Sequence, residues 1–392
     1  MTPNPARLRA SACAGMFVFG VSVAILGAVL PVEVSRLSFD LVQSGHLFGV
    51  LNLGVLVAGL GLGPLMDRYG MKAPMIAGPL LVALSLTGIG QAPSFGALLA
   101  SVLLLGLGGG TLNAATNTLA ADLHAEARNK SAALNLLGVF FGLGALLVPS
   151  AMGVLAGRTE LSVILAATAM ICAAVGVWPA MLAFPPAKHA GHVAFGDAAR
   201  LLGDPLMLVT AGLLFFQAGN EVLLAGYTTT FLASELGAPV SQASWLLTLL
   251  WVTVIAARLG LARVALWIPG HRIVLAGGAI SGVGALLLIT AQSLAIASAA
   301  LVICGVGMAG IFPTTMGMAG ARHRERSGTV FGILLTISRT GSMMVPYTAG
   351  HLAQAAGLRV ALGLVLAGAL AVTLLESLGE RLRWDRPPGL SF

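Results

Sequence analysis

Long apolar runs separated by short polar segments follow one another along the whole chain. Most runs exceed the roughly 18 residues that cross a bilayer core as a helix. They are continuous and do not alternate at every second residue, which argues against a membrane β-barrel. Spanning backbone has no water to bind at that depth, so each run is expected to be helical. We predict twelve spans, at residues 11–31, 44–66, 73–92, 96–122, 131–155, 161–184, 206–233, 241–262, 272–291, 295–319, 328–350 and 356–377.

Composition supports the same conclusion. Of all residues 57% are hydrophobic and 9% are charged, whereas a soluble domain has about a quarter of its residues charged. The first span follows Arg7 and Arg9 in the manner of a signal peptide, but no small-residue cleavage site precedes Pro31, so we expect it to remain a helix. The expected fold class is all-α, a polytopic membrane protein with twelve transmembrane helices in two pseudo-symmetric six-helix bundles.

A repeat of about half the chain length underlies the two bundles. Three features recur in order, with offsets of 199, 198 and 197 residues: Gly106-Leu107-Gly108 and Gly305-Val306-Gly307, Arg128 and Arg326, Pro149 and Pro346. Such a parallel repeat is typical of transporters whose solute site lies between the halves. We expect an N-terminal bundle at 1–184, a cytoplasmic linker at 185–205 and a C-terminal bundle with a short tail at 206–392. His189 and His192 are expected to be solvated linker residues, not metal ligands.

Basic residues predict the orientation. Of the 21 Lys and Arg residues, all but four fall at the cytoplasmic ends of spans if the N-terminus is inside; Arg36, Arg158 and Arg359 lie outside and Arg339 lies within a span. The positive-inside rule then places both termini in the cytoplasm. The expected location is a cell membrane, the bacterial inner membrane. The net charge of +7 is scattered over every inside loop, so no nucleic-acid partner is expected.

Glu221 and Arg339 lie deep within apolar stretches, where ionisable groups are costly and usually functional. Polar residues at helical spacing accompany them, which predicts faces turned toward the interior. These faces are Gln217, Asn220, Glu221, Leu224 and Thr228; Thr336, Arg339, Thr340, Met343 and Tyr347; and Asn113, Thr116 and Asn117. Tyr227, Trp245, Trp251 and Tyr347 are candidate stacking surfaces.

Two interpretations of the charged residues stay open. Glu221 and Arg339 could form a permanent structural ion pair. Alternatively, Arg339 binds a carboxylate or a hydroxylated solute and Glu221 carries a co-transported proton, although a neighbouring arginine would oppose that. The sequence shows no clustered catalytic set and no Walker loop, so we expect neither an enzyme nor a cofactor. We expect a monomer in a lipid bilayer, with a small-molecule solute and a co-transported proton as candidate partners.

The segment from Gly63 to Lys72, predicted to connect spans 2 and 3, reads GPLMDRYGMK. It closely resembles the G-x-L-x-D-R-x-G-x-K/R motif of the major facilitator superfamily, whose twelve-helix fold and transport activity it therefore implies. The resemblance implies that Asp67 and Arg68 latch the two halves on the cytoplasmic side, with Gly63, Gly70 and Lys72 completing the gate motif. Alternatively, the charges only fix the topology.

Shorter stretches resemble sugar permeases of the fucose–galactose–glucose type. They are residues 108–117 on helix 4, residues 218–221 followed by Tyr227 on helix 7, and residues 311–314 on helix 10. Asn113 and Gly27 stand where the pattern has acids, so proton symport does not carry over. The expected function is alternating-access transport of a small polar solute, with a sugar favoured. The alternative is an organic-anion or drug exporter or antiporter.

Other residues have expected structural roles. Glu33, Arg36 and Asp40 are expected to be solvated beyond helix 1. Gly138, Phe141, Gly142 and Gly144 are expected to permit close helix packing. Cys13, Cys172 and Cys304 read as small buried hydrophobes.

Overall fold

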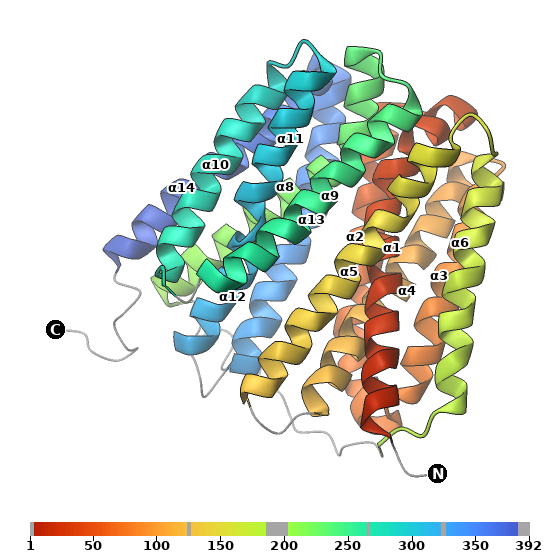
Figure 1. The fold of residues 1–392 in the computed structure, drawn as a ribbon, viewed down its shortest axis with the longest axis vertical. Coiled ribbons are helices and arrows are strands. Elements are labelled where there is room, and N and C mark those ends of the chain that lie inside the picture. Colours follow the sequence, from red (N-terminus) through yellow and green to blue (C-terminus); the bar gives the residue numbers. More distant parts are fainter. Residues whose placement is uncertain (1–3, 124–126, 186–202, 265–266, 323–326, 383–392) are drawn as a thin grey trace. The chain divides into compact units, whose positions relative to one another are not determined.

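The computed structural model describes residues 4–123, 127–185, 203–264, 267–322 and 327–382, and every regular element in this part is helical (Figure 1). Eleven helices in the described residues are long and apolar enough to cross a membrane. The predicted eleventh span corresponds to α13 (Ser327–Ala356), which is long enough at 30 residues but is not among them. Arg339 and several hydroxyl side chains lower its mean hydropathy. Residues 186–202, which include His189 and His192, lie outside the description.

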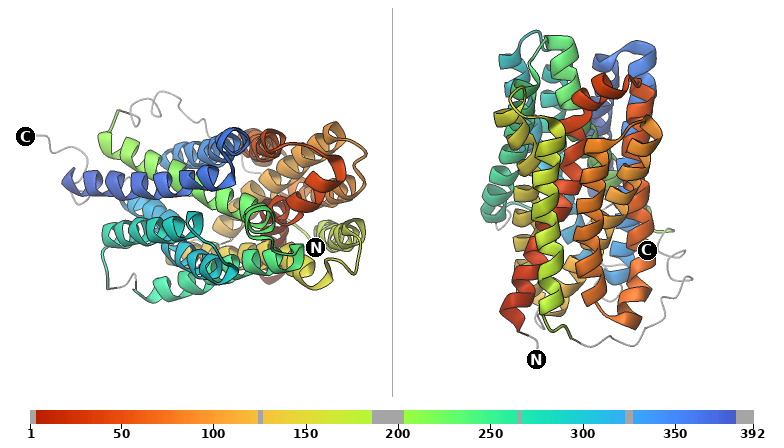
Figure 2. Two further views of the ribbon diagram at one scale, coloured as in Figure 1. Left: turned by 90° about the horizontal axis from the view of Figure 1, so that it is seen from above. Right: turned by 90° about the vertical axis from the view of Figure 1, so that its right-hand side faces the viewer.

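The chain divides into two compact units, Met1–Gly191 with Ala238–Thr248, and His192–Gly237 with Leu249–Phe392. Figure 2 shows the helices running lengthwise beside one another within each unit. The first unit contains α1 (Pro5–Leu37), α2 (Leu41–Tyr69), α3 (Lys72–Gln91), α4 (Phe95–Asp122), α5 (Ala127–Leu155), α6 (Leu161–Val177) and the 3₁₀ turn η1 (Trp178–Met181). The second contains α8 (Pro205–Leu236), α10 (Gly270–Ile289), α11 (Leu294–Ala309), α12 (Ile311–Arg322), α13 and α14 (Leu358–Arg381). α9 (Val240–Val264) contributes to both.

Glycines allow α1 and α5 to cross in backbone contact. A Cβ atom on Gly144 would overlap the carbonyl oxygen of Phe17, and one on Gly20 would overlap that of Phe141. Small residues at such crossings permit the close approach that stabilises membrane helices. The expected packing role is thus confirmed for Gly144, whereas a Cβ on Gly138 would meet no described atom within 4 Å.

The second unit repeats this crossing between α8 and α13. A Cβ atom on Gly341 would overlap the carbonyl oxygen of Phe215, while one on Gly219 would lie 3.0 Å from the Gly341 carbonyl oxygen. Gly341 follows Gly144 by 197 residues, and Phe215 follows Phe17 by 198. The internal repeat seen in the sequence therefore also appears in the way helices pack inside each unit.

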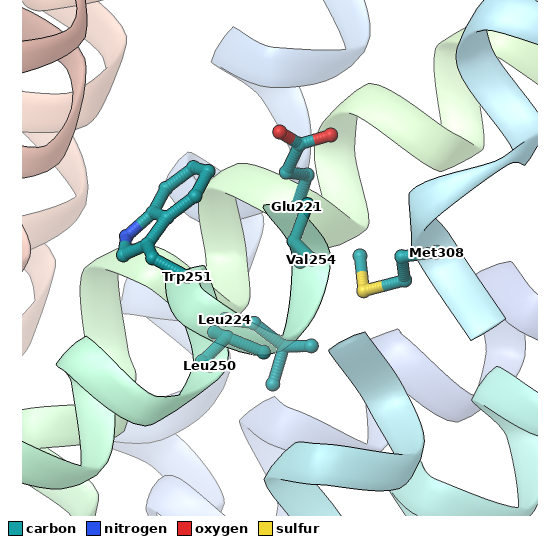
Figure 3. Close-up of a pocket in the computed structure, with 6 residues that line it drawn as sticks. All are labelled: Glu221, Leu224, Leu250, Trp251, Val254 and Met308. Atoms are coloured by element: carbon teal, nitrogen blue, oxygen red, sulfur yellow. The ribbon is translucent and has the colours of Figure 1, made fainter. Parts of the chain in front are cut away.

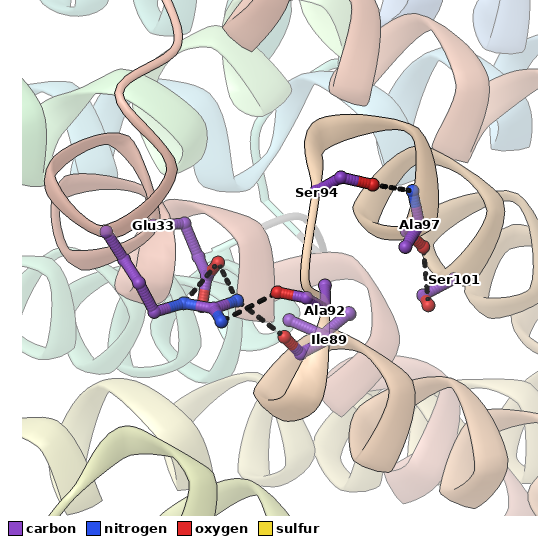
Figure 4. Close-up of polar contacts among 7 residues, drawn as sticks. Glu33, Ile89, Ala92, Ser94, Ala97 and Ser101 are labelled. Atoms are coloured by element: carbon purple, nitrogen blue, oxygen red, sulfur yellow. Dashed lines mark hydrogen bonds and ion pairs between the residues drawn. The ribbon is translucent and has the colours of Figure 1, made fainter.

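An ion pair between the exposed Arg36 and the buried Glu33 fastens the C-terminal end of α3. Arg36 donates to the carbonyl oxygens of Ala92 at 2.8 Å and Ile89 at 3.1 Å, and its Nη2 lies 2.6 Å from Glu33 Oε2 (Figure 4). We call this arrangement the α3 clamp. The Glu33 side chain is 1% exposed, so the expectation that it is solvated is wrong. The reason is that α1 continues past it, and its carboxylate is covered and paired. Asp40 remains exposed and caps α2.

The second unit has an equivalent arrangement at the C-terminal end of α10. Arg359 donates to the carbonyl oxygens of Ile289 at 3.0 Å and Ala291 at 2.8 Å, and its Nε lies 3.1 Å from Glu235 Oε2. We call this the α10 clamp. In each unit the acid comes from the first helix and the carbonyls from the end of the third. The arginine comes from the first helix in the α3 clamp and from the last helix in the α10 clamp.

Candidate solute site

Glu221 lies near the middle of α8, with its carboxylate partly open. Its side chain is 23% exposed, whereas the four residues before it, 217–220, are buried. Figure 3 shows the carboxylate pointing away from the apolar side chains of Leu224 and Val254. A charged group halfway along a helix of membrane-spanning length is thus turned away from its hydrophobic neighbours.

Two arginines of the second unit interact electrostatically with this carboxylate. Arg258 Nη2, from α9, lies 3.8 Å from Glu221 Oε1, and the charge of Glu221 also acts on Arg339 of α13. A separation of 3.8 Å is too long for a hydrogen bond. In the described part of the chain neither Glu221 oxygen accepts a hydrogen bond from the protein. Glu221 and Arg258 therefore form a loose pair, and Arg339 lies within electrostatic reach of the same carboxylate.

A helix break positions Arg258. The tenth predicted span divides at Gly310 into α11 and α12. Pro313 has no N–H to donate to the Ala309 carbonyl four residues earlier, so that acceptor needs another partner. Arg258 supplies it, since its Nε donates to the Ala309 carbonyl oxygen at 3.2 Å. One guanidinium therefore satisfies the broken helix and faces Glu221.

The other predicted polar residues of α8 fasten helices to one another. Gln217, Asn220 and Tyr227 are all buried. Each donates to a backbone carbonyl of a neighbouring helix: Gln217 Nε2 to Met308 at 3.2 Å, Asn220 Nδ2 to Val365 at 3.1 Å, and Tyr227 Oη to Pro346 at 3.4 Å. Their side-chain donors are therefore engaged within the second unit. Glu221 is then the residue of this polar face whose polar group is most accessible.

An apolar pocket lies beside Glu221 (Figure 3). The pocket is shallow, and its enclosed volume of about 10 Å³ has room for about one water molecule. The lining residues are Glu221, Leu224, Leu250, Trp251, Val254 and Met308. Of these six, Glu221 alone is ionisable, so the pocket combines one charged edge with a hydrophobic floor.

The candidate stacking residues occupy different surroundings. Trp251 is 2% exposed and lines the pocket. Trp245 is exposed and its ring lies against Gly153 of α5, within the first unit. Tyr347 is exposed, and its ring meets that of His351 edge-on at 4.8 Å between centroids. Trp251 is thus the one of these three that the described pocket includes.

The predicted polar face of α4 lies in the first unit. Asn117 Nδ2 donates to the Asn113 backbone carbonyl at 2.7 Å and lies 3.1 Å from Asn113 Oδ1. Both asparagines are partly exposed, whereas Thr116 is buried and donates to the Leu112 carbonyl. Asn117 donates to Asn113 and both side chains remain partly exposed, so their role in solute binding stays a prediction.

The gate motif is more helical than expected. Gly63, Asp67 and Arg68 lie on α2, not in a loop, and their side chains are outside the described residues. Gly70 ends the helix with φ +83° and ψ 172°, a conformation essentially restricted to glycine. Lys72 is exposed and begins α3. The latch formed by Asp67 and Arg68 stays a prediction.

Arg258 is the site residue that sequence reasoning missed. Its position near the end of a predicted span made it one of many positive-inside residues. Pro313 was the available signal, because it frees a carbonyl inside a membrane helix and so demands a donor. Nothing in the sequence identified Arg258 as that donor.

Comparison with known proteins identifies the family. The model of the Major Facilitator Superfamily matches residues 12–219 and again residues 209–392. The chain belongs to the major facilitator superfamily. It is therefore a polytopic membrane transporter, which confirms the family and the broad function expected from the gate motif.

Two curated relatives share 24% identity with this chain. The uncharacterized MFS-type transporter YfkL of Bacillus subtilis matches over 367 residues, covering 88% of this chain and 89% of that protein. The human vesicular acetylcholine transporter matches over 328 residues, 80% of this chain. The match spans 61% of that transporter's length.

Solved structures show the same fold. A bacterial homologue of the lysosomal transporter Spinster, inward-facing and unoccupied, has a TM-score of 0.81 at 15% identity, covering 99% of this chain and 100% of that one. A variant of the fucose:proton symporter FucP of E. coli has a TM-score of 0.63 at 18% identity, covering 95% and 98%. Likeness at these identities concerns the fold alone, and it is lower for the sugar symporter.

Proposed function

We propose that this major facilitator superfamily transporter moves a small polar solute by alternating access and binds it at Glu221, Arg258 and Arg339. The observation that carries the proposal is the partly open carboxylate in mid-helix with two arginines around it. Charges at such depth are costly, and they are retained where they face a solute or ion pathway. The looseness of the Glu221–Arg258 pair also argues against a purely structural bridge, which needs good geometry to offset its desolvation.

Two solute classes have support. A sugar is favoured by the short stretches that resemble sugar permeases. An organic anion is favoured by the two guanidinium groups of Arg258 and Arg339, which suit carboxylates. A cationic cargo, of the kind named for the vesicular acetylcholine transporter, would meet two guanidinium groups and is disfavoured by Coulomb repulsion.

The remaining features follow from the sequence. We propose a monomer in a bacterial inner membrane. Both termini would be cytoplasmic, as the distribution of basic residues predicts. Asp67 and Arg68 would latch the cytoplasmic side. Asn113, Asn117 and Tyr347, which keep exposed polar surface, are the further candidates for solute contact. A proton carried on Glu221 is the candidate coupling ion.

The test is uptake into proteoliposomes with a panel of labelled sugars and carboxylates, with and without a pH gradient. Arg339→Gln and Glu221→Gln should each lower uptake by about tenfold, the effect of roughly 1.4 kcal/mol. Arg263→Gln is the matched control, because Arg263 is an exposed arginine on the same helix as Arg258. Gel filtration must show that all variants fold.

Wild-type uptake in both site variants would overturn the proposed site. Uptake that ignores the pH gradient in the wild type and in Glu221→Gln would exclude proton coupling through Glu221.

A further inference from the structure

Side chains from two other helices hold two successive carbonyl groups at the break between α11 and α12. Gln217 Nε2, from α8, donates to the Met308 carbonyl oxygen at 3.2 Å. Arg258 Nε, from α9, donates to the next carbonyl oxygen, that of Ala309, also at 3.2 Å. A helix that breaks inside a membrane needs donors for the carbonyls it frees. The end of α11 is therefore fastened to α8 by a neutral side chain and to α9 by a charged one.

The two arms of the broken helix pack differently against α10. α11 meets it backbone to backbone, since a Cβ atom on Gly277 would lie 2.6 Å from the Gly307 carbonyl oxygen. α12 meets it through the end of a side chain, since a Cβ atom on Gly270 would first meet Met318 Sδ at 2.9 Å. A methionine side chain adapts by rotation, whereas backbone cannot. α12 is therefore the arm that can turn about Gly310 without disturbing a backbone crossing.

Arg258 connects this break to the charge of Glu221. Its Nε donates to the Ala309 carbonyl oxygen, and its Nη2 lies 3.8 Å from Glu221 Oε1. Figure 3 shows Glu221 and Met308, the residue before Ala309, lining the same pocket. The carbonyl and the carboxylate face different nitrogens of one guanidinium, so they do not compete for a donor. A cation within a membrane span needs a counter-charge, and the carboxylate supplies it at the place from which Arg258 reaches Ala309.

Neutralising Glu221 removes that counter-charge. α9 ends at Val264, about two turns beyond Arg258, and a long arginine side chain turns its head toward water when it can. Arg339 of α13 also acts on Glu221. On α11, α12, α13 and α14, which pack against α8, the other described acidic, basic and imidazole side chains lie nearer the helix ends: Arg322, His351, Arg359, Glu376, Glu380 and Arg381.

We infer that Arg258 is a positioning residue that transmits the charge of Glu221 to the α11–α12 break. Ionised Glu221 keeps Arg258 on the Ala309 carbonyl and α12 in place, whereas neutral Glu221 releases Arg258 and frees α12. The inference rests on the proposed function and describes what a proton taken up at Glu221 does. A proton shifts a conformational equilibrium only if the two states bind it differently, and the hydrogen bond to Ala309 provides that difference.

The test is hydrogen–deuterium exchange of α12 amides, measured by mass spectrometry on purified protein at one pH. Glu221→Gln stands for the neutral acid, and Arg258→Met removes both the cation and its donors. Each should speed exchange over α12 by about tenfold, the effect of losing one hydrogen bond from a charged group. Exchange over α11 should stay as in the wild type. Arg263→Gln, an exposed arginine on the same helix, should change neither.

Combined variants separate this role from a purely structural one. Glu221→Gln added to Arg258→Met should cause no further increase, because the charge acts through that arginine. Glu221→Gln added to Gln217→Leu should keep its full tenfold effect, because the Gln217 amide is neutral. Arg258→Gln keeps a donor without the charge and should also abolish the effect of Glu221→Gln. It serves as the background if Arg258→Met does not fold.

Unchanged α12 exchange in Glu221→Gln overturns the inference. An equal rise over α11 and α12 overturns it too, as does a full effect of Glu221→Gln in the Arg258→Met background. If one of these results appears while proteoliposome uptake still falls in Glu221→Gln and Arg339→Gln, the inference fails and the proposed site stands. If uptake is also at the wild-type level in both variants, both fail.

Discussion

Replacement of Gly341 by alanine should destabilise the second unit by forcing α8 and α13 apart. The added methyl would lie on the Phe215 carbonyl oxygen, with the carbonyl carbon at 2.7 Å and the Cα at 2.9 Å. Carbon atoms in contact prefer about 3.5–4.0 Å. All three obstructing atoms are backbone, so no side-chain rotation relieves the overlap and the helices must separate by roughly 1 Å.

The magnitude follows from two opposing effects. Overpacking a tight contact costs about 1–3 kcal/mol, and a rigid backbone obstacle puts this site at the upper end. Alanine in place of glycine gains up to about 1 kcal/mol of helix propensity. The net loss should be about 2 kcal/mol, which for a unit of this size lowers the melting temperature by roughly 4–8 °C.

Gly332→Ala is the matched control on the same helix. Gly332 is exposed, and a Cβ there would meet no described atom within 4 Å, so only the propensity gain should remain. Both variants would be compared with the wild type by thermal unfolding in detergent, with tryptophan fluorescence as the readout. Equal stability of Gly341→Ala and Gly332→Ala would refute the backbone crossing at Gly341.

Three further outcomes are expected. Arg36→Met should destabilise the first unit by about 3 kcal/mol, because the buried Glu33 carboxylate loses its cation. Adding Glu33→Gln should recover part of the lost melting temperature, and no recovery would contradict the α3 clamp. Tyr227→Phe should cost about 1 kcal/mol and leave the transport KM unchanged, while a raised KM would place this tyrosine against the solute. Gly70→Ala should cost about 1–3 kcal/mol, whereas Gly138→Ala should cost nothing; equal melting points would exclude strain at the end of α2.

The helical class and the internal repeat could be predicted because both follow from local pattern. Continuous apolar runs of spanning length can cross lipid only as helices. Pro149 and Pro346 mark the repeat directly. The repeat also explains why Gly144 and Gly341 act alike. These features depend on residue type and spacing, which a sequence displays.

Side-chain partners across helices could not be predicted. Glu33 looked exposed because nothing local shows that α1 continues past it and that its carboxylate is buried. Gln217 and Asn220 looked like pathway residues because a polar side chain in a membrane helix needs a partner, and the pattern does not say whether a solute or a backbone carbonyl provides it. Arg258 is held at the site by a hydrogen bond to a carbonyl oxygen that Pro313, on a helix far along the chain, leaves without its usual donor.

The two clamps show that a cation can change its place in the chain while the bonds it makes are retained. Ser162 precedes Arg359 by 197 residues, and its Cα lies 3.2 Å from where a Cβ on Gly90 would project near the end of α3. Ser162→Arg in an Arg36→Met background should therefore rebuild the α3 clamp, with its arginine at the position that corresponds to Arg359 of the α10 clamp. A residue-by-residue alignment of the two halves would miss this similarity. The two clamps share the contacts between a cation and carbonyl oxygens, but the cation comes from different positions in the two halves.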